Sequence, residues 1–325
     1  MITTQLAEKI HSQINNSTKI MLVAHQNADG DALGALCAMY VYLKDLEKQV
    51  FIYSPEAVIN KYQFLPYIEH VNSDIEAAKA FDPDLIIVLD TGDLRHAGLA
   101  DHLEDFSKPK IINIDHHPTN ENYGHINLVR TQAVSTSEII LQFFKIIKFQ
   151  ITKEVATCLL TGIIFDSNNF TNPNTTLSSL QATAELLKLG ARMPQVNDNF
   201  IRNKSLETLQ LWGDVLSRLK YDEEYGTATT VVTKKDLKKY NLEPEAYDGI
   251  SNFLNNLGGV KASILLKEEE GGIIRGSMRT NSDNVDLSEL AKTLGAGGKG
   301  GGHRKAAGFT VKGKLRETDT GWEVV

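Results

Sequence analysis

Short apolar runs alternate with longer segments of helical periodicity through the first half of the chain. Residues 19–24 (K-I-M-L-V-A) form the first such run, and residues 49–53, 85–89 and 111–114 are further runs of this kind. Short apolar runs bounded by polar residues are typical of buried strands, whereas residues 31–46 carry apolar side chains at helical spacing. This alternation predicts a parallel sheet with helices on both faces.

The pattern becomes helical from residue 135 and changes again in the last third of the chain. Helices are predicted over residues 135–147, 153–166 and 177–190, followed by a connecting helix over residues 206–220. Beyond Gly226, strands and helices alternate once more, which predicts a second and smaller α/β unit. Its predicted strands cover residues 227–232, 261–267 and 271–279, and its predicted helices lie near residues 247–256 and 286–294.

Length and composition agree with a two-domain α/β protein. The chain has 325 residues, of which 42% are hydrophobic, and chains of this length usually divide into two domains. We expect a first domain over residues 1–190, a helical linker over residues 191–221 and a second domain over residues 222–325.

The net charge and the N-terminal sequence indicate which partners and which cellular compartment to expect. The formal net charge of −7 argues against a protein that holds long nucleic acid by charge alone. The N-terminal residues lack the apolar core of a signal peptide, and no apolar run approaches the length of a membrane span. Cys37 and Cys158 lie in apolar helical segments and are expected to be buried thiols. These features predict a cytoplasmic protein that does not bind membranes.

Four short motifs rich in aspartate and histidine recur in the first domain. They are H-Q-N-A-D-G-D-A-L-G at residues 25–34, V-L-D-T-G-D at 88–93, N-I-D-H-H-P at 113–118 and T-G-I-I-F-D at 161–166. The first three are associated with predicted strands, and the carboxyl ends of parallel strands meet at one edge of a sheet. Carboxylates and imidazoles gathered in one place suit divalent metals, and an oxygen-rich set favours Mn²⁺ or Mg²⁺ over structural zinc.

Each motif also has a simpler explanation when it is taken alone. Asp29 and Asp31 suit helix capping, because they stand at the start of a predicted helix. Asp90 suits a turn with the Thr-Gly pair that follows it. Residues 115–117 fit a solvated polar loop, and Asp166 fits the turn at a helix end. Four coincidences in one domain are less expected than one shared metal site.

A local basic region marks the second domain of this acidic chain. Residues 275–316 contain nine Lys or Arg and three Asp or Glu. The glycine-rich motif G-G-G-H-R-K-A-A-G at residues 300–308 offers unhindered backbone N–H groups, which suit a phosphate group. Composition alone favours a flexible solvated loop with a basic face over a phosphate-binding site.

These motifs together resemble the DHH phosphoesterase superfamily, which is named for the residue types found here at 115–117. The motif at residues 300–308 is similar to the signature of the DHH-associated domain. Within the superfamily, the layout is most similar to bacterial oligoribonucleases (nanoRNases) that are also phosphatases of 3′-phosphoadenosine 5′-phosphate (pAp). The resemblance implies an N-terminal parallel-sheet DHH domain, a smaller DHH-associated domain and an active site in the cleft between them.

The resemblance also implies a centre of two Mn²⁺ ions, for which Mg²⁺ or Co²⁺ are substitutes. A hydroxide between the two ions would be the nucleophile, and Asp90 would bridge the ions. The implied ligands of the first ion are His25, Asp29 and Asp90, and those of the second are Asp31, Asp90, His116 and Asp166.

Further residues receive roles from the same resemblance. His117 would contact the scissile phosphate or protonate the leaving oxygen. Asp115 would not bind metal itself but would fix the orientation of a histidine. The nucleotide would be held by Arg279, Gly301, Gly302 and His303.

The implied reaction is hydrolysis of phosphoesters in short nucleotides. Substrates would be oligoribonucleotides of about two to five nucleotides and pAp, since a compact basic pocket neutralises few phosphates. Two alternatives remain open, namely a phosphodiesterase of linear or cyclic dinucleotides (pApA or cyclic di-AMP) and a non-catalytic nucleotide sensor. We expect a monomer or a homodimer.

Overall fold

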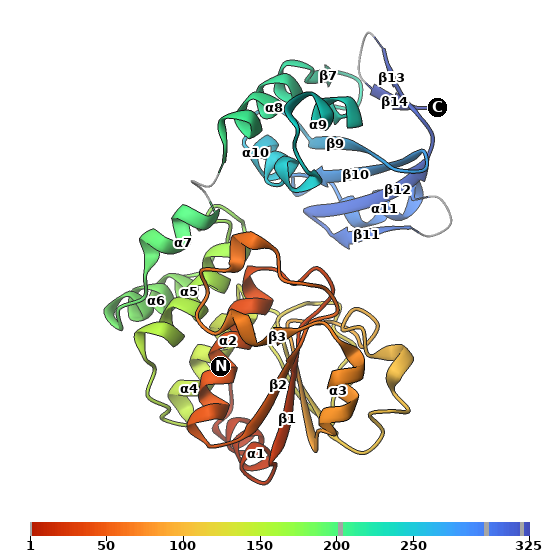
Figure 1. Ribbon diagram of the computed structural model, residues 1–325. Coiled ribbons are helices and arrows are strands. Elements are labelled where there is room, and N and C mark those ends of the chain that lie inside the picture. The colour runs from red at the N-terminus through yellow and green to blue at the C-terminus, as the bar shows by residue number, and fades with distance from the viewer. Residues whose placement is uncertain (1, 201–203, 296–298, 319–321) are drawn as a thin grey trace. The chain divides into compact units, whose positions relative to one another are not determined.

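The structure is a computed structural model that describes residues 2–200, 204–295, 299–318 and 322–325. It divides into two compact units, residues 1–203 and residues 204–325 (Figure 1). The predicted linker, residues 191–221, includes the last helix of the first unit and the first helix of the second. Part of the glycine-rich segment, residues 296–298, lies outside the described residues.

Six parallel strands form the sheet of the first unit, in the order β3-β2-β1-β4-β5-β6. The chain winds outward from β1 in both directions, so β1 and β4 adjoin at the switch point where open α/β sheets place their ligands. The predicted parallel sheet is confirmed, although the sequence analysis did not identify the two short edge strands. The strands are β1 (Lys19–Val23), β2 (Gln49–Tyr53), β3 (Val71–Asn72), β4 (Leu85–Leu89), β5 (Lys110–Asp115) and β6 (Ile126–Val129).

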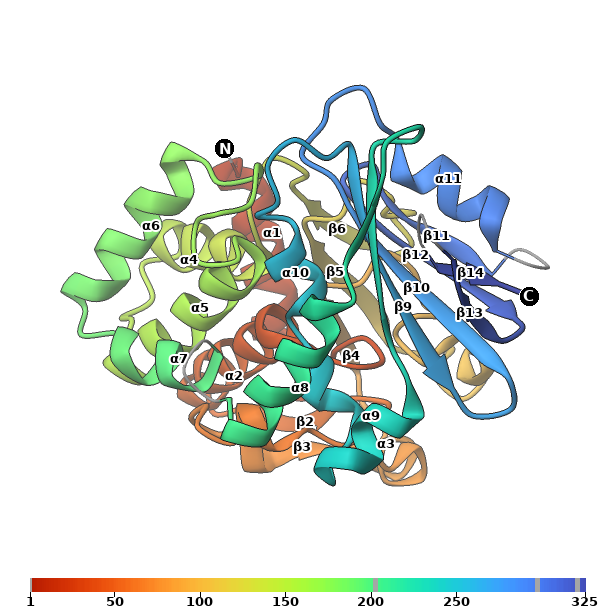
Figure 2. The same cartoon turned by 90° about the horizontal axis from the view of Figure 1, so that it is seen from above.

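Helices cover both faces of this sheet, but unequally (Figures 1 and 2). Alternate residues of β1 enter separate cores: Leu22 packs with helices α1, α2, α4 and α5, whereas Val23 packs with α3. Helices α6 and α7 pack on α5. The helices are α1 (Thr4–Asn15), α2 (Gly30–Asp45), α3 (Ile75–Phe81), α4 (Thr136–Ile146), α5 (Lys153–Asp166), α6 (Leu177–Lys188) and α7 (Met193–Phe200), with 3₁₀ turns η1 (Asn60–Tyr62), η2 (Ile68–His70) and η3 (Ala100–His102).

Small residues allow α2 and α5 to approach each other closely. An added Cβ at Gly34 would overlap the carbonyl oxygen of Cys158, and one at Gly30 would lie 2.8 Å from Cβ of Phe165. Cys37 and Cys158 are both buried free thiols, as predicted. Because Gly30 meets Phe165, the first turn of α2 lies against the last turn of α5. The carboxylates at these two helix ends are thereby brought together.

The second unit is built on a mixed sheet in the order β11-β12-β10-β9-β8-β7. Strands β8 and β9 are parallel, and the other neighbouring strands are antiparallel. Helix α11 packs on one face through Leu287 and Ala291, while α8 and α10 pack on the other through Leu211 and Ile250. The glycine-rich motif is not the loop that its composition also allowed, because Gly300–His303 forms β11 and pairs with β12.

Besides β11, the described residues of the second unit form seven strands and four helices. Residues 315–317 and 322–324 form a separate two-stranded ladder, β13 with β14. These seven strands of the second unit are β7 (Lys220–Asp222), β8 (Thr227–Val232), β9 (Ala262–Glu269), β10 (Ile273–Arg279), β12 (Ala306–Lys312), β13 (Leu315–Glu317) and β14 (Trp322–Val324). The helices of the unit are α8 (Leu206–Ser217), α9 (Lys234–Tyr240), α10 (Ile250–Leu254) and α11 (Leu287–Leu294), with the 3₁₀ turn η4 (Pro244–Tyr247).

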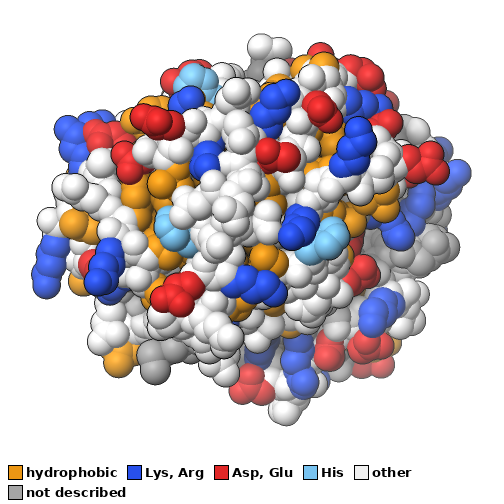
Figure 3. All heavy atoms as spheres, turned by 90° about the horizontal axis from the view of Figure 1, so that it is seen from below, with side chains coloured by type: hydrophobic (Ala, Val, Ile, Leu, Met, Phe, Trp, Pro, Cys, Tyr) orange, Lys and Arg blue, Asp and Glu red, His pale blue; other side chains and the backbone are white. Residues whose placement is uncertain are grey.

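The mixture of charges on the surface (Figure 3) agrees with the acidic net charge of the sequence. Figure 3 shows basic and acidic side chains interspersed over the face seen there, rather than one continuous basic area. Among the described residues, every helix is too short or too polar to serve as a membrane span.

Candidate metal centre

The first motif places His25 and Asp29 just before and at the start of α2. Asp29 is the N-cap residue, and its Oδ1 accepts hydrogen bonds from the backbone N–H groups of Asp31 (2.9 Å) and Ala32 (3.2 Å). Its second oxygen, Oδ2, lies 3.9 Å from Nε2 of His25. Helix capping and metal binding are therefore compatible in Asp29, because they use different oxygens.

Asp31 is fully buried in the first turn of α2 and is held by a second helix. Its Oδ2 accepts a hydrogen bond from the backbone N–H of Thr136 (2.5 Å), and its Oδ1 accepts one from Ser137 (2.9 Å). First-turn N–H groups have no partner within their own helix, and the positive end of α4 favours a carboxylate. The sequence analysis missed Thr136 and Ser137, although S-T-S-E at residues 135–138 is a recognisable helix start.

Asp90 lies directly after β4 and contacts residues from three other segments. Its backbone has the left-handed φ of +58°, which is uncommon for a residue other than glycine. Oδ2 lies 3.7 Å from Nε2 of His25, and Oδ1 lies 3.4 Å from Nε2 of His116. The hydroxyl of Thr136 donates a hydrogen bond to Oδ1 across 2.9 Å. A strained backbone at a buried carboxylate indicates a functional position.

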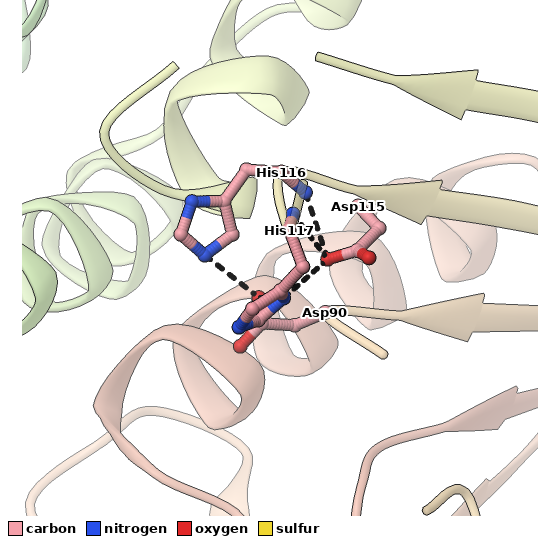
Figure 4. A group of neighbouring side chains, drawn as sticks. All are labelled: Asp90, Asp115, His116 and His117. Carbon is pink, nitrogen blue, oxygen red and sulfur yellow. Dashed lines mark hydrogen bonds and ion pairs between the residues drawn. The ribbon is translucent and has the colours of Figure 1, made fainter. Parts of the chain in front are cut away.

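The third motif is organised around Asp115, the last residue of β5. Its Oδ1 accepts hydrogen bonds from the backbone N–H groups of His116 (2.7 Å) and His117 (3.2 Å) and lies 2.7 Å from Nδ1 of His117. The side-chain amide of Asn120 donates to Oδ2 across 2.6 Å. Figure 4 shows Asp115 directed at His117 and the His116 ring directed at Asp90. Asp115 therefore fixes the orientation of the His117 ring.

Asp166 is the last residue of α5, as the sequence predicted. Its Oδ2 lies 3.1 Å from Nε2 of His116. The side chain of Asn172 donates a hydrogen bond of 2.8 Å to its backbone oxygen and so fixes the turn after the helix. His116 consequently lies between the carboxylates of Asp90 and Asp166.

Carboxylates crowd this site and interact mainly with one another and with histidines. Burial raises the pKa of Asp31 well above its usual value, and the charges of Asp90 and Asp166 add to that effect. Burial and nearby carboxylates also raise the pKa values of Asp29 and Asp166. Among the described residues, the ion pairs formed by Asp29, Asp90 and Asp166 are all with histidines.

The histidines respond to these carboxylates. Burial disfavours the protonated form of His25, but Asp90 and Asp29 outweigh that effect and raise its pKa to about 10. Burial likewise opposes protonation of His116, yet Asp166 and Asp90 raise its pKa well above the usual value. Protonation of these two histidines therefore places positive charge beside the carboxylates.

The donor atoms fall into groups that suit divalent cations. The ligand atoms of His25, Asp29 and Asp90 lie within 4.8 Å of one another, and the same holds for those of Asp31, His116 and Asp166. A third group contains Asp90 with residues 115–117. Oxygen and imidazole donors without cysteine suit Mn²⁺ or Mg²⁺, and the mutually repelling carboxylates supply the negative charge that such cations neutralise. The residues present thus fit a metal centre.

The predicted substrate-binding residues lie together in the second unit. Arg279 ends β10, and its guanidinium donates hydrogen bonds to Oδ1 of Asn252 and to the backbone oxygen of Met278, both across 3.0 Å. Gly301, Gly302 and His303 belong to β11, which joins β10 through β12. Gly302 has a φ of +137°, where a residue with a Cβ is strained.

Family comparisons match both units of the chain. The DHH family, N-terminal domain, matches residues 19–163, and the DHHA1 domain matches residues 226–320. The bifunctional oligoribonuclease and PAP phosphatase NrnA of Thermus thermophilus is 30% identical over 296 residues, which cover 90% of this chain and 84% of that protein. The protein of the same name from Bacillus subtilis is 26% identical over 301 residues, which cover 90% and 89%.

Solved structures agree with these sequence relationships. The crystal structure of an exopolyphosphatase-related protein from Bacteroides fragilis has a TM-score of 0.90 and 25% sequence identity, and the match covers 97% of this chain and 93% of that one. Both domain matches follow in the same order along one chain. This protein therefore belongs to the DHH family and carries a DHH domain followed by a DHHA1 domain.

Proposed function

We propose that this protein is a Mn²⁺-dependent phosphohydrolase that cleaves short oligoribonucleotides to mononucleotides and also dephosphorylates pAp. As a member of the DHH family, it is a phosphoric ester hydrolase. The single observation that carries the proposal is the convergence of four aspartates and two histidines from separate segments in partly buried groups that are linked through Asp90 and His116. The names of the Thermus and Bacillus relatives support the choice of oligoribonucleotides and pAp.

The residues of the first unit divide into two proposed metal-binding sets. His25, Asp29 and Asp90 would hold one ion, and Asp31, Asp90, His116 and Asp166 would hold the other, with Asp90 shared. When bound, two such ions polarise a phosphoryl group and lower the pKa of water at neutral pH. The backbone N–H groups of Thr136 and Ser137 hold the carboxyl group of Asp31 in place, and the hydroxyl of Thr136 holds that of Asp90.

His117 is the proposed partner of the leaving oxygen. Burial opposes protonation of its ring, but the hydrogen bond to Asp115 raises the pKa of His117. A protonated imidazole fixed through Nδ1 can donate a proton from Nε2 to the oxygen that leaves the phosphorus. Asp115 acts through His117 and is therefore a positioning residue.

The second unit is the proposed substrate-binding domain. Arg279 is held by two hydrogen bonds to uncharged groups, so its positive charge is available to an anion. Backbone at Gly301 is open, since an added Cβ there would meet nothing within 4 Å among the described residues. With Gly302 and His303 it forms the proposed contact to a nucleotide. Residues 1–190 would then supply catalysis and residues 222–325 substrate binding.

A substrate panel tests this proposal directly. The panel contains pAp, the dinucleotide pApA, a five-nucleotide RNA, a long single strand, cyclic di-AMP and pyrophosphate, each assayed for product release with and without Mn²⁺. Fastest cleavage of pApA and pAp supports the proposal. Preference for the long strand, cyclic di-AMP or pyrophosphate contradicts the proposed substrate class but leaves the metal centre intact. Binding of a dinucleotide with Mn²⁺ but without cleavage indicates a nucleotide sensor instead.

A further inference from the structure

A polar cavity opens in the first unit beside the candidate metal centre. Its volume of about 630 Å³ falls in the range of pockets that hold small ligands. Three segments form its wall: the chain after β6, the first half of α4, and the chain that leads into α6. The lining residues are Arg130, Thr131, Gln132, Ala133, Glu138, Gln142, Pro173, Asn174, Thr176 and Ser178.

Arg130 is the unusual member of this wall. Its Nη1 is buried, yet it has no hydrogen-bond partner among the described residues. No carboxylate of the described chain forms an ion pair with it. By contrast, Arg218, Arg275 and Arg316 each pair with a carboxylate, and Arg304 donates a hydrogen bond to a backbone carbonyl group. Because Arg130 also lines the cavity, it places in this wall a positive charge that has no anionic partner among the described residues.

Each wall segment is joined to the candidate metal centre by a hydrogen bond at or next to its lining residues. The backbone N–H of Arg130 donates to the backbone oxygen of Asp115 across 2.9 Å. On α4, Thr136 donates a hydrogen bond to Asp90 and lies two residues before the cavity residue Glu138. Asn172, which precedes the third wall segment, bonds to the backbone of Asp166. The cavity therefore adjoins the centre, although none of the proposed metal ligands lines it.

The acidic member of the wall is already satisfied. Glu138 accepts hydrogen bonds from the backbone N–H of Val134 (2.9 Å) and from the hydroxyl of Ser178 (2.5 Å), and the amide of Gln142 lies 3.4 Å away. Through these contacts the carboxylate of Glu138 links α4 to the loop after β6 and to α6. They leave the guanidinium of Arg130 as the unpaired charge of the cavity.

We infer that this cavity is a substrate subsite in which Arg130 binds a phosphate group other than the one that is cleaved. The inference rests on the proposed function, because that function supplies substrates with more than one phosphate. A planar guanidinium binds phosphate through paired hydrogen bonds. The amides of Gln132, Gln142 and Asn174 can pair with the edge of an adjoining base. The first unit thus contributes to substrate length preference as well as to chemistry.

The test compares two substrates that differ in their number of phosphates. The trinucleotide pApApA carries phosphates besides the scissile one, whereas ApA carries the scissile phosphate alone. In Arg130→Gln, the ratio of kcat/KM for pApApA to that for ApA is expected to fall about 10- to 100-fold, because one charge-assisted contact is lost. The slope of log(kcat/KM) for pApApA against log salt concentration is expected to become shallower by about 0.7. Arg130→Lys should recover part of the ratio.

Arg192→Gln is the matched control. Arg192 is an exposed arginine of the same unit, whose backbone meets Thr157 about 13 Å along α5 from Asp166. This variant should leave the ratio unchanged. Equal losses on both substrates, a lowered melting temperature of Arg130→Gln, or an unchanged ratio would each overturn the subsite. If the wild type cleaves neither substrate, the proposed function fails instead, and Mn²⁺-independent binding of pApApA, weakened by Arg130→Gln, still tests the subsite.

Discussion

The hydroxyl of Thr136 donates a 2.9 Å hydrogen bond to Oδ1 of Asp90, while its backbone N–H donates to Asp31. One residue at the start of α4 thereby holds two carboxylates that belong to different segments. Both contacts are fully buried. The start of α4 is consequently part of the metal centre, although neither Thr136 nor Ser137 is a proposed ligand.

Thr136→Val removes the hydroxyl and keeps both the shape and the backbone N–H. We expect Mn²⁺ affinity and kcat to fall about 10- to 100-fold, because groups that support metal ligands usually have effects of this size. Thr136→Ser restores the hydroxyl and should recover most of the loss. Metal affinity is measured by titration calorimetry. Wild-type affinity in Thr136→Val would show that Asp90 needs no support from α4.

A second prediction separates the roles of the two units. His116→Ala removes the imidazole between Asp90 and Asp166, so bound metal and turnover should both be lost while the fold persists. Arg279→Met should keep metal binding and raise KM about 10- to 100-fold, because a charged contact to the substrate is lost. Metal content and KM are measured on the same preparations. Loss of metal from Arg279→Met, or turnover by His116→Ala, would contradict the assignment.

Asp115→Asn should change the pH dependence of the reaction. The pKa of His117 is raised because its contact with Asp115 outweighs the effect of burial. If protonated His117 serves the leaving oxygen, activity declines as the pH rises through that pKa. Asp115→Asn weakens the raising interaction, so the alkaline limb of the kcat/KM profile should move to lower pH. His117→Gln should remove the limb altogether, and an unmoved limb in Asp115→Asn would exclude this role.

Metal binding should release protons from the protein. Without metal, the pKa of His25 is raised to about 10 and that of Asp29 to about 7, so both groups carry protons near neutral pH. A cation must displace these protons, and Mn²⁺ affinity should therefore rise between about pH 6 and pH 8. Calorimetry in two buffers with different protonation enthalpies counts the protons released. A flat affinity over this range would show that the site is already deprotonated.

The sequence predicted the sheet and the motif positions because both depend on local patterns. Strands β2, β4 and β8 coincide with predicted strand segments, and β4 is apolar and buried along its whole length, as central parallel strands usually are. The sequence analysis did not predict edge strand β6, because its four residues, Ile126–Val129, are too few to establish a periodic pattern. The sequence analysis did not predict β11, because three of its four residues are glycine, which is depleted in strands.

The supporting residues of the site were harder to predict than its proposed ligands. The contact between Thr136 and Asp31 joins residues that are 105 positions apart. No local pattern encodes such a contact, since it depends on how α4 meets α2. Arg130 was missed for the same reason.

Gly162 provides the last prediction, because its role depends on tertiary contact rather than on helix propensity. It lies inside α5, where alanine would normally stabilise the helix by about 1 kcal/mol. An added Cβ would, however, overlap Oδ1 of Asp31 and Oγ of Ser137. Gly162→Ala should therefore lower the free energy of unfolding by about 1–3 kcal/mol, as overpacked cores do. It should also weaken Mn²⁺ binding, because Asp31 is displaced.

Gly213 of α8 is the matched control for this substitution. It is an exposed helical glycine whose added Cβ would meet nothing within 4 Å among the described residues. Gly213→Ala should raise stability by about 0.5–1 kcal/mol and leave Mn²⁺ affinity unchanged. Denaturant unfolding and metal titration of both variants measure the two effects. The changes in the free energy of unfolding have opposite signs in the two variants only if the contact with Asp31 outweighs helix propensity at Gly162. Equal stabilisation of both variants would disprove that contact.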